Sequence, residues 1–395
     1  MMKRLIVLVC ALLLSACSSI AIHPAAPPAA QLFSDSSFAA ASEDVGADQI
    51  LAATPAMKRY VDDALRSQRD KPPHRALFDA LYRRDQLKIE YDSATTRTAA
   101  QTFDARSGNC ISLVIMTAAL AREMGLQVQF QSVFVDESWS RSGSLYISSG
   151  HVNIVLGRNK MYQAGYDASA YLVIDFLPPA DIRSLDARPI DEKTVLAMFM
   201  NNRAAESLVE GKLDNAYWWA RSAILQDPDF YSAYNTLGVI YKQHGDLAMA
   251  ERTMRYMAQL TPSSTVPLYN LARILDSMGR DAEAKTVREQ LARMEPNPPF
   301  HYFNLGLKAM EEGQYFKARA LFAREVERQP GYHEFHFWLA LAAYKLGDLR
   351  LADKHLKLAL ENSTTRRDHE LYAGKLERLR AEGIRLRGGR GSDPD

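Results

Sequence analysis

The sequence is poor in cysteine, with only Cys10, Cys17 and Cys110 among 395 residues. So few cysteines exclude a small scaffold held by several disulfides and a zinc site made of four cysteines. The chain also lacks an excess of charge of one sign, because 48 Lys and Arg residues stand against 47 Asp and Glu residues. This balance provides no broad electrostatic field that would hold nucleic acid, and we expect no nucleic-acid partner.

A glycine-rich loop for binding phosphate is also missing from the sequence, and no cofactor is expected. His333 and His336 are three residues apart on a predicted helix, but no third metal ligand stands at a useful spacing. We therefore interpret these two histidines as packing residues and expect no metal site. Hydrophobic residues make up 47% of the chain, which is ordinary for a globular protein with a sizeable core.

Residues 1–16 have the pattern of a secretion signal. Lys3 and Arg4 precede an apolar run, 5–14, which as a helix would rise about 15 Å, half of the hydrocarbon core of a bilayer. The run is therefore too short for a membrane span and is expected to be removed. Its removal takes Cys10 away and leaves 46 basic against 47 acidic residues.

The signal ends in Leu14-Ser15-Ala16-Cys17, which resembles the lipobox of bacterial lipoproteins. The resemblance implies that Cys17 is lipidated and that several acyl chains anchor the protein stably in a membrane of the bacterial cell envelope. Ser18, where Asp would retain a lipoprotein in the inner membrane, implies the outer membrane and a position facing the periplasm. The alternative is an ordinary signal with a cleavage site of small residues and a chance cysteine.

Residues 17–46 are rich in Ala, Ser and Pro and show no periodicity. They are expected to form the lipid anchor and a flexible linker, with an average end-to-end distance of about 30 Å. Residues 47–190 begin with helical spacing of apolar residues, after Thr54-Pro55 and again after Pro72-Pro73. The stretch 87–91 alternates apolar and polar residues, as in a short strand.

The run 111–125 is apolar around most of its circumference, as in a helix that is buried at the centre of a domain. Three strand-like runs follow, at 126–135, 151–157 and 171–177, and a loop rich in Ser and Gly separates the first two. A loop of this length is either an active-site flap or a mobile excursion. Helices followed by strands indicate an α+β domain.

The C-terminal half of the chain repeats every 34 residues. Five glycines and five alanines keep this spacing: Gly211, Gly245, Gly279, Gly313 and Gly347, and Ala216, Ala250, Ala284, Ala318 and Ala352. Each glycine suits a turn between two helices, and each alanine lets paired helices approach. The register resembles the tetratricopeptide repeat, which implies five repeats over 197–366, an all-α solenoid and a groove for a protein or peptide partner. Residues 367–384 are predicted to form a capping helix and 385–395 a disordered tail.

Cys110 opens the predicted buried helix, and His151 and Asp175 follow on two predicted strands. A thiol at a helix N-terminus lies at the positive end of the helix dipole, which favours the nucleophilic thiolate. An imidazole can then transfer protons, and a carboxylate can hold the imidazole in the required tautomer. The alternative is that Cys110 is a small hydrophobic core residue and that Asp175 pairs with an arginine.

The order of these residues resembles the transglutaminase-like superfamily, whose core is papain-like. The matching positions are Arg106, Gly108, Cys110, Gly150-His151-Val152 and Val173-Ile174-Asp175. The resemblance implies an α+β transglutaminase-like domain in which Cys110 is the nucleophile, His151 the general acid and base, and Asp175 the orienting carboxylate. Animal transglutaminases carry Trp after the cysteine, whereas Ile111 follows here, so hydrolysis or another amide exchange is expected ahead of cross-linking of Gln to Lys.

These features together predict a membrane-anchored cysteine enzyme that acts on amide bonds of a peptide or protein through a thioester at Cys110. It would be a cysteine peptidase or amidase, or a transglutaminase-like acyltransferase, and its repeats would bind the substrate or a protein partner. The alternative is an envelope scaffold lipoprotein whose first domain is catalytically idle. A structural binder of the cell wall is a third hypothesis.

Overall fold

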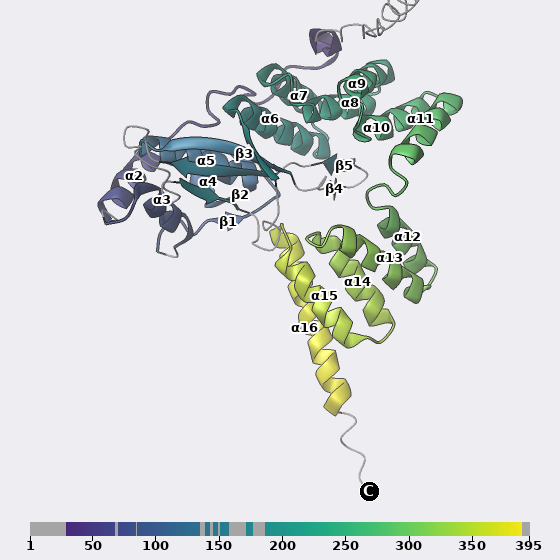
Figure 1. Ribbon diagram of the computed structural model, residues 1–395. Coiled ribbons are helices and arrows are strands. Elements are labelled where there is room, and N and C mark those ends of the chain that lie inside the picture. The colour runs from purple at the N-terminus through teal and green to yellow at the C-terminus, as the bar shows by residue number, and fades with distance from the viewer. Residues whose placement is uncertain are drawn as a thin grey trace, which may run out of the picture.

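A computed structural model shows a mixed α and β domain followed by an array of paired helices (Figure 1). The structure describes residues 29–67, 70–83, 85–134, 139–142, 145–148, 151–157, 171–176 and 186–388. The predicted signal, 1–16, and Cys17 lie outside the described residues, and so do residues 389–395. Gly150, one of the residues that carry the family resemblance, is also outside them.

The helices of the first domain surround one central helix. Helix α2 (Pro55–Ser67) begins at Pro55, as predicted. Helix α3 (Pro73–Tyr82) begins at Pro73, one residue before the predicted start. Helix α5 (Cys110–Glu123) is buried without interruption from Ile111 to Ala121. This confirms the prediction of a central helix, because a helix that is apolar on all sides is stable only when neighbours cover its whole circumference.

Four strands form an antiparallel sheet in the order β7–β6–β3–β8. Their bounds are Gln127–Phe134 for β3, His151–Gly157 for β6, Tyr171–Ile174 for β7 and Asp186–Ile190 for β8. Every residue of β6 is buried, and α5 packs on this strand and on β3. Strand β8 was not predicted, because it contains Pro189 and its apolar and polar residues do not alternate clearly. A strand that contains proline fits the edge of a sheet, and β8 lies at the edge.

Two smaller pairs of strands complete the domain. The parallel pair is β1 (Glu90–Tyr91) with β2 (Ser107–Gly108), and helix α4 (Ala99–Ala105) connects them. The strand predicted over 87–91 is therefore confined to its last two residues. The long predicted loop contains an antiparallel hairpin, β4 (Trp139–Ser142) with β5 (Leu145–Ser148).

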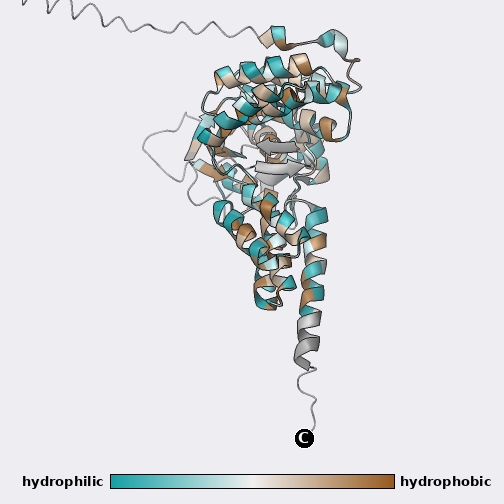
Figure 2. Ribbon diagram, turned by 90° about the vertical axis from the view of Figure 1, so that its right-hand side faces the viewer, coloured by the Kyte–Doolittle hydropathy of each residue, from teal (hydrophilic) through white to brown (hydrophobic). Residues whose placement is uncertain are grey.

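The array consists of ten helices in five consecutive pairs. The pairs are α6 (Glu192–Val209) with α7 (Leu213–Gln226), α8 (Ser232–His244) with α9 (Leu247–Leu260), α10 (Val266–Ser277) with α11 (Asp281–Met294), α12 (His301–Glu311) with α13 (Tyr315–Arg328), and α14 (His333–Lys345) with α15 (Leu349–Glu361). Hydrophobic residues alternate with hydrophilic ones along these helices (Figure 2). All five repeated alanines are wholly buried, and all five repeated glycines have a positive φ, for example 93° at Gly245. The repeats thus form a tetratricopeptide-like helical solenoid.

The ends of the array differ slightly from the prediction. Helix α6 begins at Glu192, ahead of the predicted start at 197, and helix α16 (Arg366–Gly388) continues beyond the predicted end of the capping helix at 384. Leu376 and Leu379 of α16 are buried together with residues of the fifth pair, so this helix covers the end of the array. Across the described part of the chain, no helix is long and apolar enough to cross a membrane.

The described part of the predicted linker, residues 29–46, is packed against the first two repeats and is called the strap below. It contains two short 3₁₀ helices, η1 (Ala29–Leu32) and η2 (Asp35–Ser37). Leu32 and Phe38 are buried, and the ring of Phe38 stacks on Tyr217 at 4.0 Å between ring centroids. The hydroxyl of Tyr241 donates to the carbonyl of Leu32 at 2.7 Å. The prediction of a flexible linker is therefore wrong for the strap, because its apolar side chains are buried against helices of the first two repeats.

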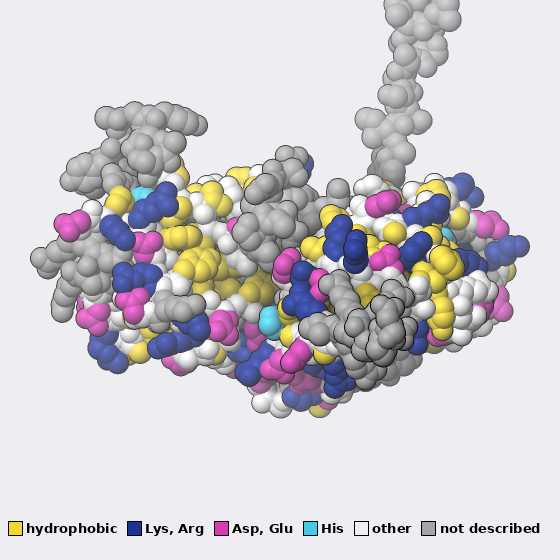
Figure 3. Space-filling view, turned by 90° about the horizontal axis from the view of Figure 1, so that it is seen from below, with side chains coloured by type: hydrophobic (Ala, Val, Ile, Leu, Met, Phe, Trp, Pro, Cys, Tyr) yellow, Lys and Arg dark blue, Asp and Glu magenta, His cyan; other side chains and the backbone are white. Residues whose placement is uncertain are grey.

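Charged side chains of both signs lie interspersed on the face of the molecule seen in Figure 3. Some of them join neighbouring repeats: Arg280, at the start of α11, contacts Glu251 of α9 at 2.5 Å and Glu283 at 2.7 Å. Ion pairs that water still reaches contribute about 1 kcal/mol or less each. The solenoid therefore depends chiefly on its buried seam rather than on ion pairs.

Candidate active site

The cap of helix α5 sets the position of Cys110, which is the first residue of the helix and a partly buried free thiol. Asn109 is the N-cap, and its Oδ1 accepts a hydrogen bond from the main-chain N–H of Ser112 at 3.0 Å. The first N–H groups of a helix have no partner within the helix. The cap satisfies the N–H of Ser112, and the main-chain amide of Cys110 lies beside the thiol and the Tyr91 phenol. Glycine is needed just before the cap, because a Cβ at Gly108 would lie 2.6 Å from the Cβ of Ser112.

His151 and Asp175 come from adjacent strands of the sheet. His151 is the first residue of β6, and Asp175 directly follows β7, which pairs with β6. The Nε2 atom of His151 lies 2.7 Å from Oδ1 of Asp175, and the two side chains are 5% and 7% exposed. Asn153, two residues along β6, reaches the other carboxylate oxygen at 3.5 Å. The carboxylate of Asp175 is therefore held by two side chains of β6, one at each oxygen.

Cys110 completes the group of three residues. Burial opposes protonation of His151, but hydrogen bonds with Asp175 and with the Cys110 sulfur, and the charges of both, outweigh burial and raise the pKa of His151 to about 9. Because Nε2 faces Asp175, Nδ1 is the ring nitrogen available to the sulfur. The structure thus brings together the three residues that the sequence singled out, with an imidazolium poised next to the thiol at neutral pH.

Tyr91 is a site residue that the sequence analysis missed. In the parallel pair of β1 and β2, Tyr91 lies opposite Gly108, and the main-chain N–H of Asp92 donates to the carbonyl of Gly108 at 3.0 Å. Burial raises the pKa of Tyr91, and negative charge at Cys110 raises it further, while the main-chain amide of Cys110 favours the ionised phenol. The hydroxyl therefore lies near both the sulfur and the amide of Cys110. A two-residue strand leaves too short a pattern to reveal this pairing.

A second aromatic side chain stands beside the carboxylate. Tyr82, at the end of α3, is 42% exposed, and its ring centroid lies 6.4 Å from that of Phe176. Burial of its hydroxyl and the charge of Asp175 raise the pKa of Tyr82 to about 12. This exposed ring provides an apolar surface at the edge of the site, which a substrate side chain could contact.

The two histidines of the fifth repeat make contacts within the array. His333 Nδ1 lies 2.8 Å from the hydroxyl of Tyr372, and His336 Nδ1 lies 2.9 Å from Nδ1 of His355. His336 also contacts the carbonyl of Pro330 at 2.8 Å through Nε2. Among the described residues, no cluster of three or more His, Cys, Asp or Glu side chains is arranged to hold a metal ion.

No protein-family model matches the sequence, and none of the curated proteins compared with it matches. Solved structures of repeat proteins do match. MamA is 21% identical, with 40% of this chain and 93% of MamA covered at a TM-score of 0.23. YrrB, a TPR protein with an unusual peptide-binding site, is 19% identical, with 46% and 92% covered at 0.24. A thermophilic TPR protein of Thermus thermophilus is 19% identical, with 46% and 98% covered at 0.30.

These matches cover less than half of this chain. Their TM-scores are too low to carry an argument, so the assignment of the array rests on its own five helix pairs and on the 34-residue period of the sequence. The function of the first domain has to be argued from the site itself.

Proposed function

We propose that this chain is a cysteine enzyme that transfers acyl groups from amide bonds of a peptide or protein. The observation that carries the proposal is the buried contact of 2.7 Å between His151 and Asp175, with the Cys110 sulfur on the other side of the imidazole. A nucleophile, a proton-transferring base and a group that orients the base are the parts that such catalysis requires. The resemblance to the transglutaminase-like superfamily assigns the same roles to Cys110, His151 and Asp175.

The reaction would proceed in two steps. In the first step, the sulfur of Cys110 bonds to the carbonyl carbon of the substrate, and the collapse of the tetrahedral intermediate breaks the C–N bond while the His151 imidazolium gives its proton to the leaving amine. In the second step, water or an amine attacks the thioester carbon, and the neutral imidazole of His151 takes a proton from this nucleophile as the thiolate leaves. Water yields an acid, and an amine yields a new amide.

The oxyanion of the tetrahedral intermediate needs hydrogen-bond donors that are already in place. The main-chain N–H of Cys110, at the start of α5, is one candidate, because helix geometry leaves it without a partner in the helix. The hydroxyl of Tyr91 is the second, since the strand pairing brings it to the same end of α5.

We assign the repeat array to the binding of the protein or peptide partner. Stacked helix pairs form an extended concave surface, which suits a peptide or a protein segment. A partner held there would be close to the first domain, because α6 and the loop before α16 both contact that domain. The N-terminal signal and Cys17 support a place in the bacterial cell envelope, with the chain anchored by lipid in the outer membrane.

Formation of an acyl-enzyme tests the catalytic proposal. With p-nitrophenyl acetate as acyl donor, the peptide that contains Cys110 should gain an acetyl group in the wild-type chain, as measured by mass spectrometry after proteolysis. Cys110→Ala should gain none while its thermal unfolding stays unchanged. Acetylation elsewhere at the wild-type rate, with Cys110 unmodified, would show that this thiol is not the nucleophile.

An idle scaffold is the second candidate function, and the length of the array, from Glu192 to Glu361, favours it. In a scaffold the Cys110 side chain would react like that of an ordinary cysteine, whose unreactive thiol form predominates at neutral pH. Measurement of the rate of iodoacetamide alkylation against pH separates the two functions. Alkylation that is already fast at neutral pH supports the enzyme, and a rate that rises only in alkaline solution supports the scaffold.

A further inference from the structure

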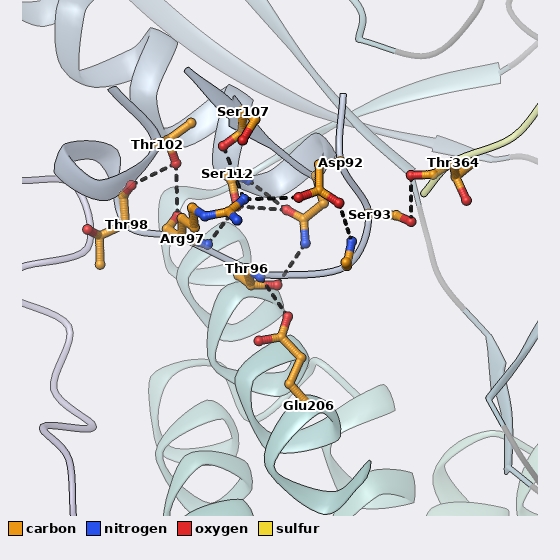
Figure 4. A network of polar contacts seen from close by, with 12 residues as sticks. Asp92, Ser93, Thr96, Arg97, Thr98, Thr102, Ser107, Ser112, Glu206 and Thr364 are labelled. Carbon is orange, nitrogen blue, oxygen red and sulfur yellow. Dashed lines mark hydrogen bonds and ion pairs between the residues drawn. The ribbon is translucent and has the colours of Figure 1, made fainter. Parts of the chain in front are cut away.

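A chain of hydrogen bonds extends from the N-terminal cap of helix α5 (Figure 4). Oδ1 of Asn109 accepts from both the main-chain N–H and the hydroxyl of Ser112, at 3.0 and 2.8 Å. The Nδ2 group of Asn109 donates to Oγ1 of Thr96 at 2.7 Å. All three side chains are nearly or wholly excluded from solvent. The orientation of the capping amide is therefore decided by Thr96 as well as by the helix.

The same chain of hydrogen bonds ends on the repeat array. The main-chain N–H of Thr96 donates to Oε1 of Glu206 at 2.7 Å, across 110 positions of sequence. Glu206 belongs to α6, the first helix of the array, and its other oxygen contacts Nη1 of Arg203 at 2.9 Å. Burial raises the pKa of Glu206 above its ordinary value, although the contacts with Thr96 and Arg203 oppose this rise. A carboxylate in such a place is held in one position by its few partners.

The segment that carries Thr96 contacts the far end of the array as well. The main-chain N–H and the hydroxyl of Ser93 both reach the carbonyl of Thr364, at 3.0 and 2.9 Å. Thr364 lies between α15 and α16, so residues 92–97 contact both the first and the last part of the array. In the same segment, the main-chain N–H of Arg97 donates to Oγ of Ser112 at 2.8 Å. The loop beside the cap is thus fastened to the array at two points.

We infer that Glu206 is a positioning residue for Cys110. Glu206, which belongs to the repeat array, holds Thr96, and Thr96 in turn orients Asn109, the cap of the helix that begins with Cys110. This inference rests on the proposed function of Cys110. It makes the array a structural part of the active site, beyond any role in binding a partner. A change of curvature in the solenoid would move α6, and with it the cap of α5.

Substitutions in the full-length chain test this inference. Glu206→Ala removes the acceptor of the Thr96 N–H, and we expect the rate of Cys110 alkylation by iodoacetamide to fall about tenfold, since small displacements of reacting groups are costly. Glu206→Gln keeps an acceptor oxygen and should restore most of the rate. Thr96→Val removes the hydroxyl that Asn109 Nδ2 donates to and that also contacts Glu206, and it should show the same loss if Glu206→Ala fails to fold.

Glu192→Gln is the matched control. Glu192 also lies on α6 and pairs with Arg122 near the other end of α5, so its loss disturbs the same helix–helix interface without reaching the cap. Its alkylation rate should equal that of the wild-type chain. Equal rates for Glu206→Ala, Thr96→Val and Glu192→Gln, measured below their unfolding temperatures, would overturn the inference.

Acylation of the same variants separates this inference from the proposed function. The acyl donor is p-nitrophenyl acetate, an activated ester that any thiolate can attack, so the rate counted is the excess over that of His151→Ala, which keeps the thiol and lacks the base. If no chain, including the wild type, shows such an excess, while alkylation still distinguishes Glu206→Ala from Glu192→Gln, the proposed enzyme is wrong and the positioning role stands. If the wild type is acylated and every variant at Glu206 and Thr96 matches it in both rates, the enzyme stands and the positioning role is wrong.

Discussion

Nε2 of His151 lies 2.7 Å from Oδ1 of Asp175, and both side chains are almost entirely excluded from water. The two residues stand 24 positions apart in the sequence: His151 begins β6, and Asp175 directly follows the neighbouring strand β7. A buried imidazole would ordinarily lose its charge, but here the carboxylate and the Cys110 sulfur keep it protonated to a pH of about 9.

Asp175→Asn should lower the pKa of His151, because the amide no longer offers a negative charge to the imidazolium. The imidazolium that pairs with a thiolate would then be lost at a lower pH than the value of about 9 in the wild-type chain. Acyl transfer should fall about 10²- to 10⁴-fold. The ring resonances of His151 followed by NMR against pH measure the shift directly. An unchanged titration would show that Asp175 does not control the protonation of the imidazole.

Tyr91→Phe should separate acylation of Cys110 from its alkylation. Acylation by p-nitrophenyl acetate passes through an oxyanion, and loss of one donor costs about 10²-fold. Alkylation by iodoacetamide forms no oxyanion, so its rate should stay at the wild-type value. A parallel loss of both rates would mean that Tyr91 acts by holding Cys110 in place. A faster acylation would mean that the hydroxyl blocks the position of the substrate oxygen.

The strap should detach when its buried ring is removed. Phe38 is 7% exposed and stacks on Tyr217, so Phe38→Ala is expected to weaken docking of the strap by about 3 kcal/mol. Hydrogen–deuterium exchange of the main-chain amides of residues 29–46 should accelerate, while exchange in α5 stays unchanged. Ser36→Ala, at an exposed position of the same segment, is the control and should leave exchange as it is. Equal protection in both variants would contradict the packing of the strap.

Acid should destabilise the fifth repeat. Burial lowers the pKa values of His336 and His355, the latter to about 4, below the value of 6.5 of an ordinary histidine. The folded state therefore binds fewer protons than the unfolded state, and the stability contributed by the neutral pair is present above pH 6.5 and is lost as the pH falls toward 4. Thermal unfolding followed by circular dichroism should shift to lower temperature over this range. His355→Gln should flatten the dependence, whereas His369→Gln, at an exposed site, should not.

Cys17→Ser should release the protein from the membrane. Lipidation of a cysteine with several acyl chains gives stable anchoring, so its loss should move the chain from the membrane fraction to the soluble fraction. Cys110→Ser, which leaves the lipobox intact, should stay with the membrane. Mass spectrometry of the N-terminal peptide gives the second measurement. A Cys17→Ser chain that remains in the membrane fraction would point to another means of attachment.

Most of the array could be predicted from sequence. The period of 34 residues reflects local requirements of each helix pair. Gly245 allows the left-handed turn between two helices, and Ala250 lets them approach each other, and neither depends on distant parts of the chain. The five helix pairs of the structure follow this register. The order of Cys110, His151 and Asp175 could be recognised for a similar reason, because each residue sits at the start or end of an element that the apolar pattern reveals.

Only the tertiary structure decided which distant groups meet. The low-complexity strap looked like a linker because its Leu32 and Phe38 are too sparse to form a periodic pattern, and the seam that covers them is made by repeats nearly 200 positions away. Tyr91 and Glu206 carry no local sign of a role beside Cys110. Their places follow from strand pairing and from the docking of α6, contacts whose free energy arises only when the chain is folded.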